Sequence, residues 1–187
     1  MASQTEICNL ALRLLGQSTI ASLEDDLPQA ITLNGIYEIA RKAALRSHYW
    51  KFAKKRKTLP ALSSAPEWGY AYQYQLPEDY LRLVEVSGVT DYQVEGLTIV
   101  TDAGAPLYIR YIKDATDPAE YDALFVEALA GDLAAMACED ITGSNTKRQI
   151  AEQFAQRARM EAKRVGAMED PSQDTPDVNF SWLTARN

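Results

Sequence analysis

The chain has 187 residues, of which 47% are hydrophobic and 24% are charged. These values are typical of one globular domain and exclude an intrinsically disordered, a collagen-like or a disulfide-scaffold protein. The formal net charge of −7 argues against a protein that coats nucleic acid over its whole surface. No run approaches the roughly 20 apolar residues that a membrane span needs. The N-terminus lacks the pattern of a signal peptide, so we expect no membrane partner.

The residues that most enzymes and metal sites require are scarce. The one histidine, His48, excludes a His-rich metal site and would have to serve any Ser-His-Asp triad, for which no Gly-x-Ser-x-Gly elbow is present. Dinucleotide and phosphate-loop motifs and a Cys-x-x-Cys pair are also lacking. The two cysteines, Cys8 and Cys138, lie in apolar helical patterns and are expected to be buried, in a reducing cytosol. We therefore expect no catalytic residue, no cofactor and no metal ion.

Two helices are predicted at the start of the chain. Ser3 and Glu6 have the spacing of a capping box, and Gly16 can end this first helix in a left-handed conformation. A second helix is predicted from Asp26-Leu27-Pro28 to Ser47, because Pro is tolerated in the first helical turn. Its apolar stripe has the spacing of a helix that packs on other helices and comprises Ala30, Leu33, Tyr37, Ala40 and Ala44.

From Thr58 to Lys113 the hydrophobic period changes from that of helices to that of strands. The alternation over 68–76 predicts one strand with four aromatic rings and a leucine on the same face, namely Trp68, Tyr70, Tyr72, Tyr74 and Leu76. Further strands are predicted over 81–86, 92–94, 97–100 and 107–111, with a hairpin turn at Glu95-Gly96. The whole segment is predicted to be a small antiparallel insertion in a helical protein.

The helical period then returns. Asp117-Pro118 is typical of a helix N-terminus. The helix predicted over 121–141 is apolar almost all round and is therefore expected to be buried on most sides, with Asp132 at a helix contact or facing a partner. A fourth helix, with one apolar and one charged face, is predicted over 145–165.

After Gly166 the sequence becomes rich in Asp, Pro and Ser, which is typical of a flexible tail. The tail ends in three apolar residues, which are expected either to fold back on the chain's own helices or to dock on another subunit: Phe180, Trp182 and Leu183. The predicted fold class is α+β, with two N-terminal and two C-terminal helices forming a four-helix body. The predicted parts are the helical body (1–57 and 114–167), the antiparallel strand insertion (58–113) and the C-terminal docking tail (168–187).

The segment over 41–57 concentrates positive charge. It holds eight basic residues, and no acidic residue occurs between Glu38 and Glu67. Such a patch attracts phosphate or an acidic protein surface. The basic residues are Arg41, Lys42, Arg46, Lys51, Lys54, Lys55, Arg56 and Lys57. Trp50 and Phe52 interleave this segment and are expected to anchor the core where helix meets sheet, which leaves the lysines solvated.

Two other features leave alternatives open. The tyrosine-rich strand is expected first of all to pack in the core, with Tyr72 and Tyr74 as further core anchors. A protein interface is the second interpretation, and a stacking platform for single-stranded nucleic acid is the third. The acidic residues in or near the sheet could in principle include a carboxylate pair for glycoside hydrolysis. These residues are Glu67, Glu78, Asp79 and Glu85.

Several motifs occur along the chain in an order typical of one family. They are Asn9-Leu10-Ala11-Leu12-x-x-Leu15-Gly16, His48-Tyr49-Trp50-Lys51-Phe52-Ala53-Lys54-Lys55-Arg56, Tyr72-x-Tyr74-x-Leu76-Pro77-x-Asp79-Tyr80-Leu81-Arg82, Arg110-Tyr111-Ile112, Asp117-Pro118, Leu124-Phe125-x-Glu127-Ala128-Leu129-Ala130, Ile141-Thr142-Gly143-Ser144 and Ser181-Trp182-Leu183-x-x-Arg186. Together they resemble the head-to-tail adaptor family of short-tailed bacteriophages and prophages, whose members are called tail tubular protein A or gatekeeper proteins. The resemblance spans nearly the whole chain.

The resemblance implies a structural virion protein of the phage tail, not an enzyme. It implies a homo-oligomeric ring below the portal protein that extends the DNA channel, supports the tail nozzle or other tail proteins, and lets double-stranded DNA pass. The implied location is the head–tail junction of the virion, after assembly in the host cytoplasm. The strand insertion is shorter than in longer relatives, so a thinner ring, as in a prophage, is an alternative to a full nozzle platform.

On this hypothesis the basic residues of 41–57 and the apolar end of the tail form the interface with the portal or with neighbouring subunits. Two alternatives remain from other classes of protein. The first is a nucleic-acid-binding module that uses the same basic segment. The second is a cell-wall-degrading tail component, an activity credited to some relatives, although no motif in this sequence supports it.

Overall fold

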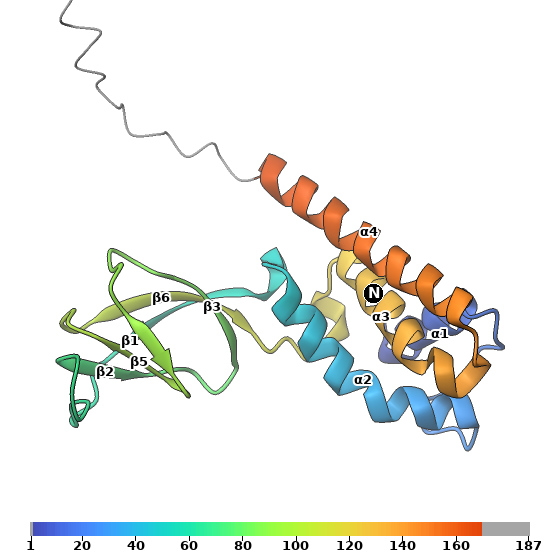
Figure 1. The fold of residues 1–187 in the computed structure, drawn as a ribbon, viewed down its shortest axis with the longest axis horizontal. Helices are drawn as coiled ribbons and strands as arrows, with labels where there is room; N and C mark the ends of the chain where they lie inside the picture. The colour runs from blue at the N-terminus through green and yellow to red at the C-terminus, as the bar shows by residue number, and fades with distance from the viewer. Residues whose placement is uncertain (1, 170–187) are drawn as a thin grey trace, which may run out of the picture.

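The computed structural model describes residues 2–169, and these form the predicted α+β fold. The elements in chain order are α1 (Gln4–Leu14), α2 (Pro28–Ser47), the 3-10 turn η1 (Lys51–Ala53), β1 (Lys54–Leu59), β2 (Tyr72–Gln75), β3 (Tyr80–Val86), β4 (Gln93–Glu95), β5 (Thr98–Thr101), β6 (Leu107–Lys113), the 3-10 turn η2 (Pro118–Glu120), α3 (Ala123–Thr142) and α4 (Asn145–Glu169). Figure 1 shows the helices gathered at one end, here called the helical body, and the strands at the other, here called the strand module.

Local signals set the bounds of the N-terminal helices. The Ser3 hydroxyl accepts a hydrogen bond from the Glu6 amide, and the Glu6 carboxylate accepts one from the Ser3 amide, so the predicted capping box is confirmed. Gly16 follows α1 at a φ of 64°, a left-handed conformation that costs glycine little. Pro28 opens α2 as predicted, and the helix ends at Ser47 because His48 is extended.

The start of the third helix differs from the prediction. Asp117 caps only the short turn η2, where its side chain accepts a hydrogen bond from the Ala119 amide. The α-helix begins after this turn, where Asp122 accepts a hydrogen bond from the Leu124 amide. Gly143 then ends α3 in a left-handed conformation, and α4 extends beyond the predicted end at residue 165.

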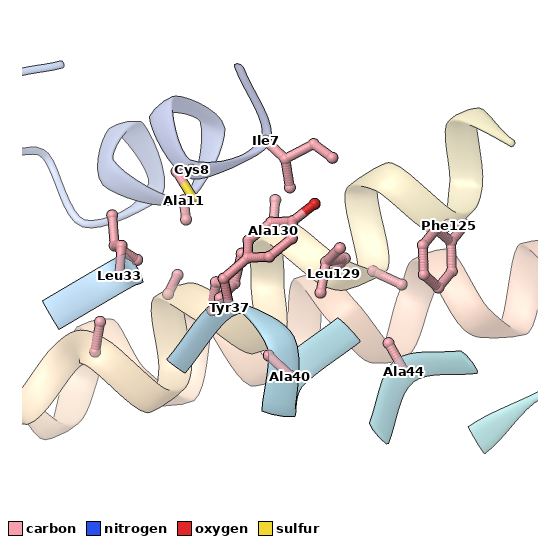
Figure 2. Close-up of a cluster of buried hydrophobic side chains, with 14 of the residues drawn as sticks. Ile7, Cys8, Ala11, Leu33, Tyr37, Ala40, Ala44, Phe125, Leu129 and Ala130 are labelled. Atoms are coloured by element: carbon pink, nitrogen blue, oxygen red, sulfur yellow. The ribbon is translucent and has the colours of Figure 1, made fainter. Parts of the chain in front are cut away.

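Helix α3 is the centre of the helical body, packing against α1, α2 and α4. Figure 2 shows Leu129 and Ala130 of α3 among side chains of α1 and α2, including the fully buried Cys8. The contact with α4 is close at Gly131, where an added Cβ would lie only 2.8 Å from the Cβ of Ala155. The prediction that this helix is buried on most sides is therefore confirmed, as is the burial of both cysteines.

The strand module consists, among the described residues, of two antiparallel three-stranded sheets, in the orders β1-β6-β3 and β2-β5-β4. In the first sheet Lys55 lies opposite Tyr111, and Lys57 lies opposite Ile109. A small apolar core separate from that of the helical body holds the module together: Leu59, Tyr74, Leu76, Val86, Ile99, Leu107, Ile109 and Tyr111.

The prediction of one long aromatic strand over 68–76 is wrong. Only Tyr72–Gln75 forms a strand, because Gly69 turns the chain at a φ of 91°. Trp68 is consequently 86% exposed, and Tyr72 is 41% exposed and is not the predicted core anchor. Tyr74 is fully buried, which confirms its prediction.

Between residues 2 and 169, no helix combines the length and the apolar character needed to cross a membrane. The same part of the chain brings no three His, Cys, Asp or Glu side chains together in a way that could hold a metal ion.

Candidate cationic cleft

A hollow lies where the helical body meets the strand module. It has a volume of about 740 Å³ and collects residues from the end of α2, from η1, β1 and β3, from the start of α3, and from the last turns of α4. Its lining includes one histidine and five charged residues, namely His48, Lys51, Lys54, Arg82, Asp122 and Lys163. Here this hollow is called the cationic cleft.

Aromatic packing forms the floor of the cleft. Trp50 is 3% exposed and donates a hydrogen bond from its indole nitrogen to the Ala44 carbonyl at 2.9 Å, which fixes the chain just after α2. Its ring packs edge-on against Phe125 of α3 and against His48. Phe52 packs on Phe125 as well. Trp50 and Phe52 are therefore the core anchors that the sequence predicts, and they hold the basic residues around them in place.

Arg82 forms the wall of the cleft on the strand side. Its guanidinium carbon lies 4.3 Å from the centre of the Tyr49 ring, a cation–π distance. The same guanidinium donates hydrogen bonds to the Arg46 carbonyl at 2.9 Å and to the Tyr49 hydroxyl at 3.0 Å. In return Arg46 donates to the Leu81 carbonyl at 2.6 Å, so two arginines clamp β3 to the end of α2.

Helix α4 forms the opposite wall. A Cβ at Gly166 would lie 3.7 Å from the Lys51 side chain, which shows how near η1 comes to this helix. Nearer the start of the same helix, Arg159 hydrogen-bonds Ser47 at 3.2 Å and pairs with Asp132 of α3. Burial raises the pKa of Asp132, although the hydrogen bond and charge of Arg159 oppose this effect. The prediction that Asp132 lies at a helix contact is confirmed.

His48 reports the electrostatics of the cleft. Its pKa is lowered from the ordinary value of 6.5, first by burial and then by the positive charges around it. These charges belong to Lys54, Lys163, Arg159 and Arg82. The same potential that disfavours a protonated imidazole favours a bound anion. The cleft is thus suited to carboxylates or phosphates presented by a partner.

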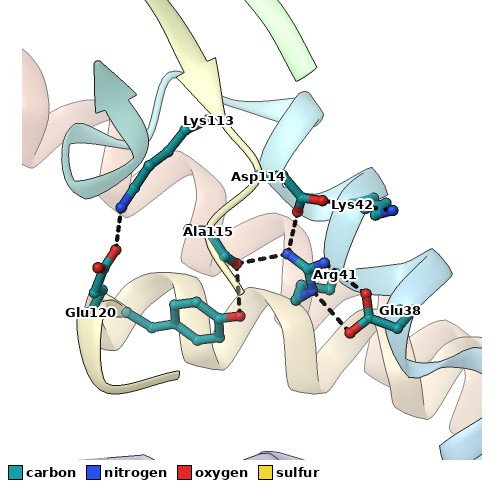
Figure 3. Close-up of polar contacts among 8 residues, drawn as sticks. Glu38, Arg41, Lys42, Lys113, Asp114, Ala115 and Glu120 are labelled. Carbon is teal, nitrogen blue, oxygen red and sulfur yellow. Dashed lines mark hydrogen bonds and ion pairs between the residues drawn. The ribbon is translucent and has the colours of Figure 1, made fainter. Parts of the chain in front are cut away.

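Arg41 is a predicted interface residue that the structure instead buries, with an exposed fraction of 1%. Its guanidinium donates to Glu38 at 2.7 Å, to Asp114 at 2.5 Å and to the Ala115 carbonyl at 2.6 Å (Figure 3). Burial alone would lower the pKa of Arg41, but the hydrogen bonds and charges of Glu38 and Asp114 raise it above its ordinary value. Arg41 therefore joins α2 to the segment after β6 and offers nothing to a partner.

The other predicted basic residues do not form one patch. Lys42 is half exposed and lies 3.6 Å from Asp114, and Lys55 pairs with Asp79 at 2.8 Å. Arg56 and Lys57 are exposed but belong to the strand module, where they line a separate hollow with Arg110. Of the eight predicted residues, Lys51 and Lys54 line the cationic cleft.

Arg82 and Lys163 belong to the cleft but were not predicted as site residues. No local signal separates them from other surface cations, because only the packing of β3 and α4 around η1 brings them together. The predicted tail residues Phe180, Trp182 and Leu183 lie outside the described residues.

Two of the four acidic candidates in the strand module, Asp79 and Glu85, have structural partners. The Asp79 carboxylate accepts hydrogen bonds from Tyr111 and Lys55, each at 2.8 Å. Burial opposes ionisation of Asp79, but these two hydrogen bonds and the Lys55 charge outweigh it and lower its pKa. Glu85 pairs with Arg110 at 3.1 Å. Such contacts stabilise the sheet and do not favour an acid–base pair.

Comparison of the sequence with protein-family models and with curated proteins finds no match.

Proposed function

We propose that the protein is a structural connector subunit that assembles as a ring below the portal of a short-tailed phage or prophage. In this role it extends the DNA channel, supports tail attachment and performs no catalysis. The motifs quoted above suggest the family, and the architecture agrees with a subunit that must contact several neighbours.

The observation that carries the proposal is the exposure of large apolar side chains on both parts of the molecule. In the strand module Trp68 is 86% exposed and Leu97 is 60% exposed. In the helical body Ile39 and Met160 are each 64% exposed. A solvated monomer gains nothing from a tryptophan in water, whereas aromatic side chains and Met are enriched where proteins meet. The cationic cleft adds a site for acidic groups between the two parts.

Sedimentation velocity tests this proposal directly. The full-length protein is run alone and mixed with the portal protein encoded by the same genetic element. We expect the portal boundary to shift by the mass of several subunits, and the size of the shift gives the stoichiometry. A protein that remains monomeric in both runs, with the portal boundary unchanged, would contradict the proposal.

A nucleic-acid-binding module is the second candidate, and the cationic cleft is the observation that favours it. Lys54, Arg82 and Lys163 converge there beside the Tyr49 ring. If the cleft binds the phosphate backbone, the affinity for an oligonucleotide should fall steeply with salt, since counterions are released on binding. Weak binding that is insensitive to substitution of Arg82 and Lys163 would exclude this candidate.

A further inference from the structure

Helices α2 and α4 lie on opposite sides of α3. Helix α3 packs against both, and Figure 1 shows it between them. The side chains of α2 and α4 that do not face α3 therefore point away from one another, toward opposite sides of the helical body. These two outward faces differ in charge, and each carries exposed apolar side chains of its own.

The outward face of α2 is an apolar row. Ile31, Gly35, Ile39 and Ala43 follow at intervals of four residues and are all exposed, so they form one line along the helix. Ile31 is 60% exposed and Ile39 is 64% exposed. Apart from the helix's own backbone, no described atom lies within 4 Å of a Cβ position at Gly35. Another helix could therefore approach closely at this point.

The same side of the molecule is acidic. Between Arg13 and Arg41 the sequence carries four acidic residues and no basic one. Glu24, Asp25 and Asp26 line a hollow of about 430 Å³ together with Ile31 and Gly35. The apolar row of α2 therefore begins beside a negatively charged recess.

The outward face of α4 has the opposite charge. The helix contains six basic residues and three acidic ones. Ile150 is 53% exposed and Met160 is 64% exposed, and the exposed Arg157 lies between them in the sequence. Their spacing of seven and three residues places all three on one face of the helix.

We propose that the outward face of α4 in one copy docks on the outward face of α2 in the next copy. Apolar side chains meet at the centre, and Arg157 approaches the acidic recess. Because the two faces lie on opposite sides of the body, the contact is heterologous and repeats from copy to copy, as a ring requires. The inference rests on the proposed ring and names the contact that builds it.

Mixed cysteine variants test the pairing of these faces. Ile31→Cys and Met160→Cys are prepared separately, with the buried Cys8 and Cys138 left in place. Mild oxidation should give disulfide-linked dimers in the mixture and not in either variant alone. Dimers in each variant alone would mean a symmetric contact and would overturn the proposal. No dimers in the mixture would also overturn the proposed contact. If sedimentation still shows assembly, the proposed ring stands without this contact. If sedimentation shows no assembly, the proposed ring fails as well.

Charge reversal gives an independent test. Asp26→Lys and Arg157→Glu should each weaken self-association by at least about tenfold, since like charges then face one another. The double variant should recover most of the loss. Glu95→Lys, on an exposed residue of β4, is the matched control and should leave association unchanged. Equal weakening by all single variants, or no recovery in the double variant, would contradict the proposed contact.

Discussion

The helical body and the strand module are stabilised by different means. In the body, α3 is surrounded by other helices, and aliphatic side chains and alanines fill the space between them. The strand module has a much smaller apolar core. It depends on buried or half-buried polar contacts such as Tyr111 with Asp79 and Arg110 with Glu85. Small sheets with little apolar surface open first, so we expect the body to be the more stable part.

Breaking the contact by which Arg41 joins α2 to the segment after β6 should have the largest effect. Arg41→Met removes the donors to Asp114 and Ala115, which leaves the Asp114 carboxylate with Lys42 at 3.6 Å and the Ala115 carbonyl with the Tyr121 hydroxyl at 3.0 Å. We expect the free energy of unfolding to fall by about 3–5 kcal/mol, as measured by urea denaturation. Lys42→Met, on a side chain that is 52% exposed, is the matched control and should cost about 0–1 kcal/mol. Similar losses for both variants would mean that Arg41 does not hold α2 to the segment after β6.

The closeness of α3 and α4 can be tested with two glycines. Gly131→Ala places a Cβ 2.8 Å from the Cβ of Ala155, and such overpacking should cost about 1–3 kcal/mol. Gly35→Ala meets no described atom within 4 Å beyond its own helix, so it should stabilise the monomer by roughly 0.5–1 kcal/mol. Thermal unfolding measures both changes. A destabilising Gly35→Ala would contradict the open outward face of α2.

Loss of a polar contact in the strand module should lower the overall free energy of unfolding less, and its effect should be concentrated in the strands. Tyr111→Phe removes the hydroxyl that donates to Asp79, and we expect a loss of about 1.5–3 kcal/mol. Hydrogen exchange should show the loss in the strands and leave α3 protected. Uniform loss of protection would mean that the two parts unfold together.

Tyr111→Phe should also change how the stability of the protein depends on pH in the acidic range. Asp79 has a lower pKa in the folded protein than its ordinary 3.8, so the unfolded chain takes up its proton first as the pH falls. The stabilisation is therefore present above the ordinary pKa and is lost as the pH falls through the folded value. Tyr111→Phe should make this loss smaller.

The cationic cleft should give the smallest effect on stability. The folded pKa of His48 lies below 6.5, so the unfolded state binds the proton first and stability should fall slightly as the pH drops below that value. His48→Gln should remove this dependence. Because the chain has one histidine, its NMR titration reports the cleft directly, and a bound polyanion should raise the pKa. An unchanged titration in the presence of a polyanion that binds would place the binding elsewhere.

Local sequence signals predicted the helices well, because the capping box at Ser3, Pro28 at the start of α2 and Gly143 after α3 act within a few residues. The aromatic strand failed at Gly69, whose positive φ outweighs the alternating pattern. Contacts between distant segments carry no such signal. The buried Arg41 depends on Asp114, and the cleft depends on the approach of α4 to β3.

The connection between the helical body and the strand module has a mechanical consequence. The chain enters the module through β1 and leaves it through β6, and these two strands pair from their first contact, Lys54 with Ile112. A single connecting strand would swivel freely, whereas two strands tied along their length resist torsion about their shared axis. Every subunit of the proposed ring would then hold its strand module in the same orientation relative to its own helical body. Trp68 would recur at one height around the axis.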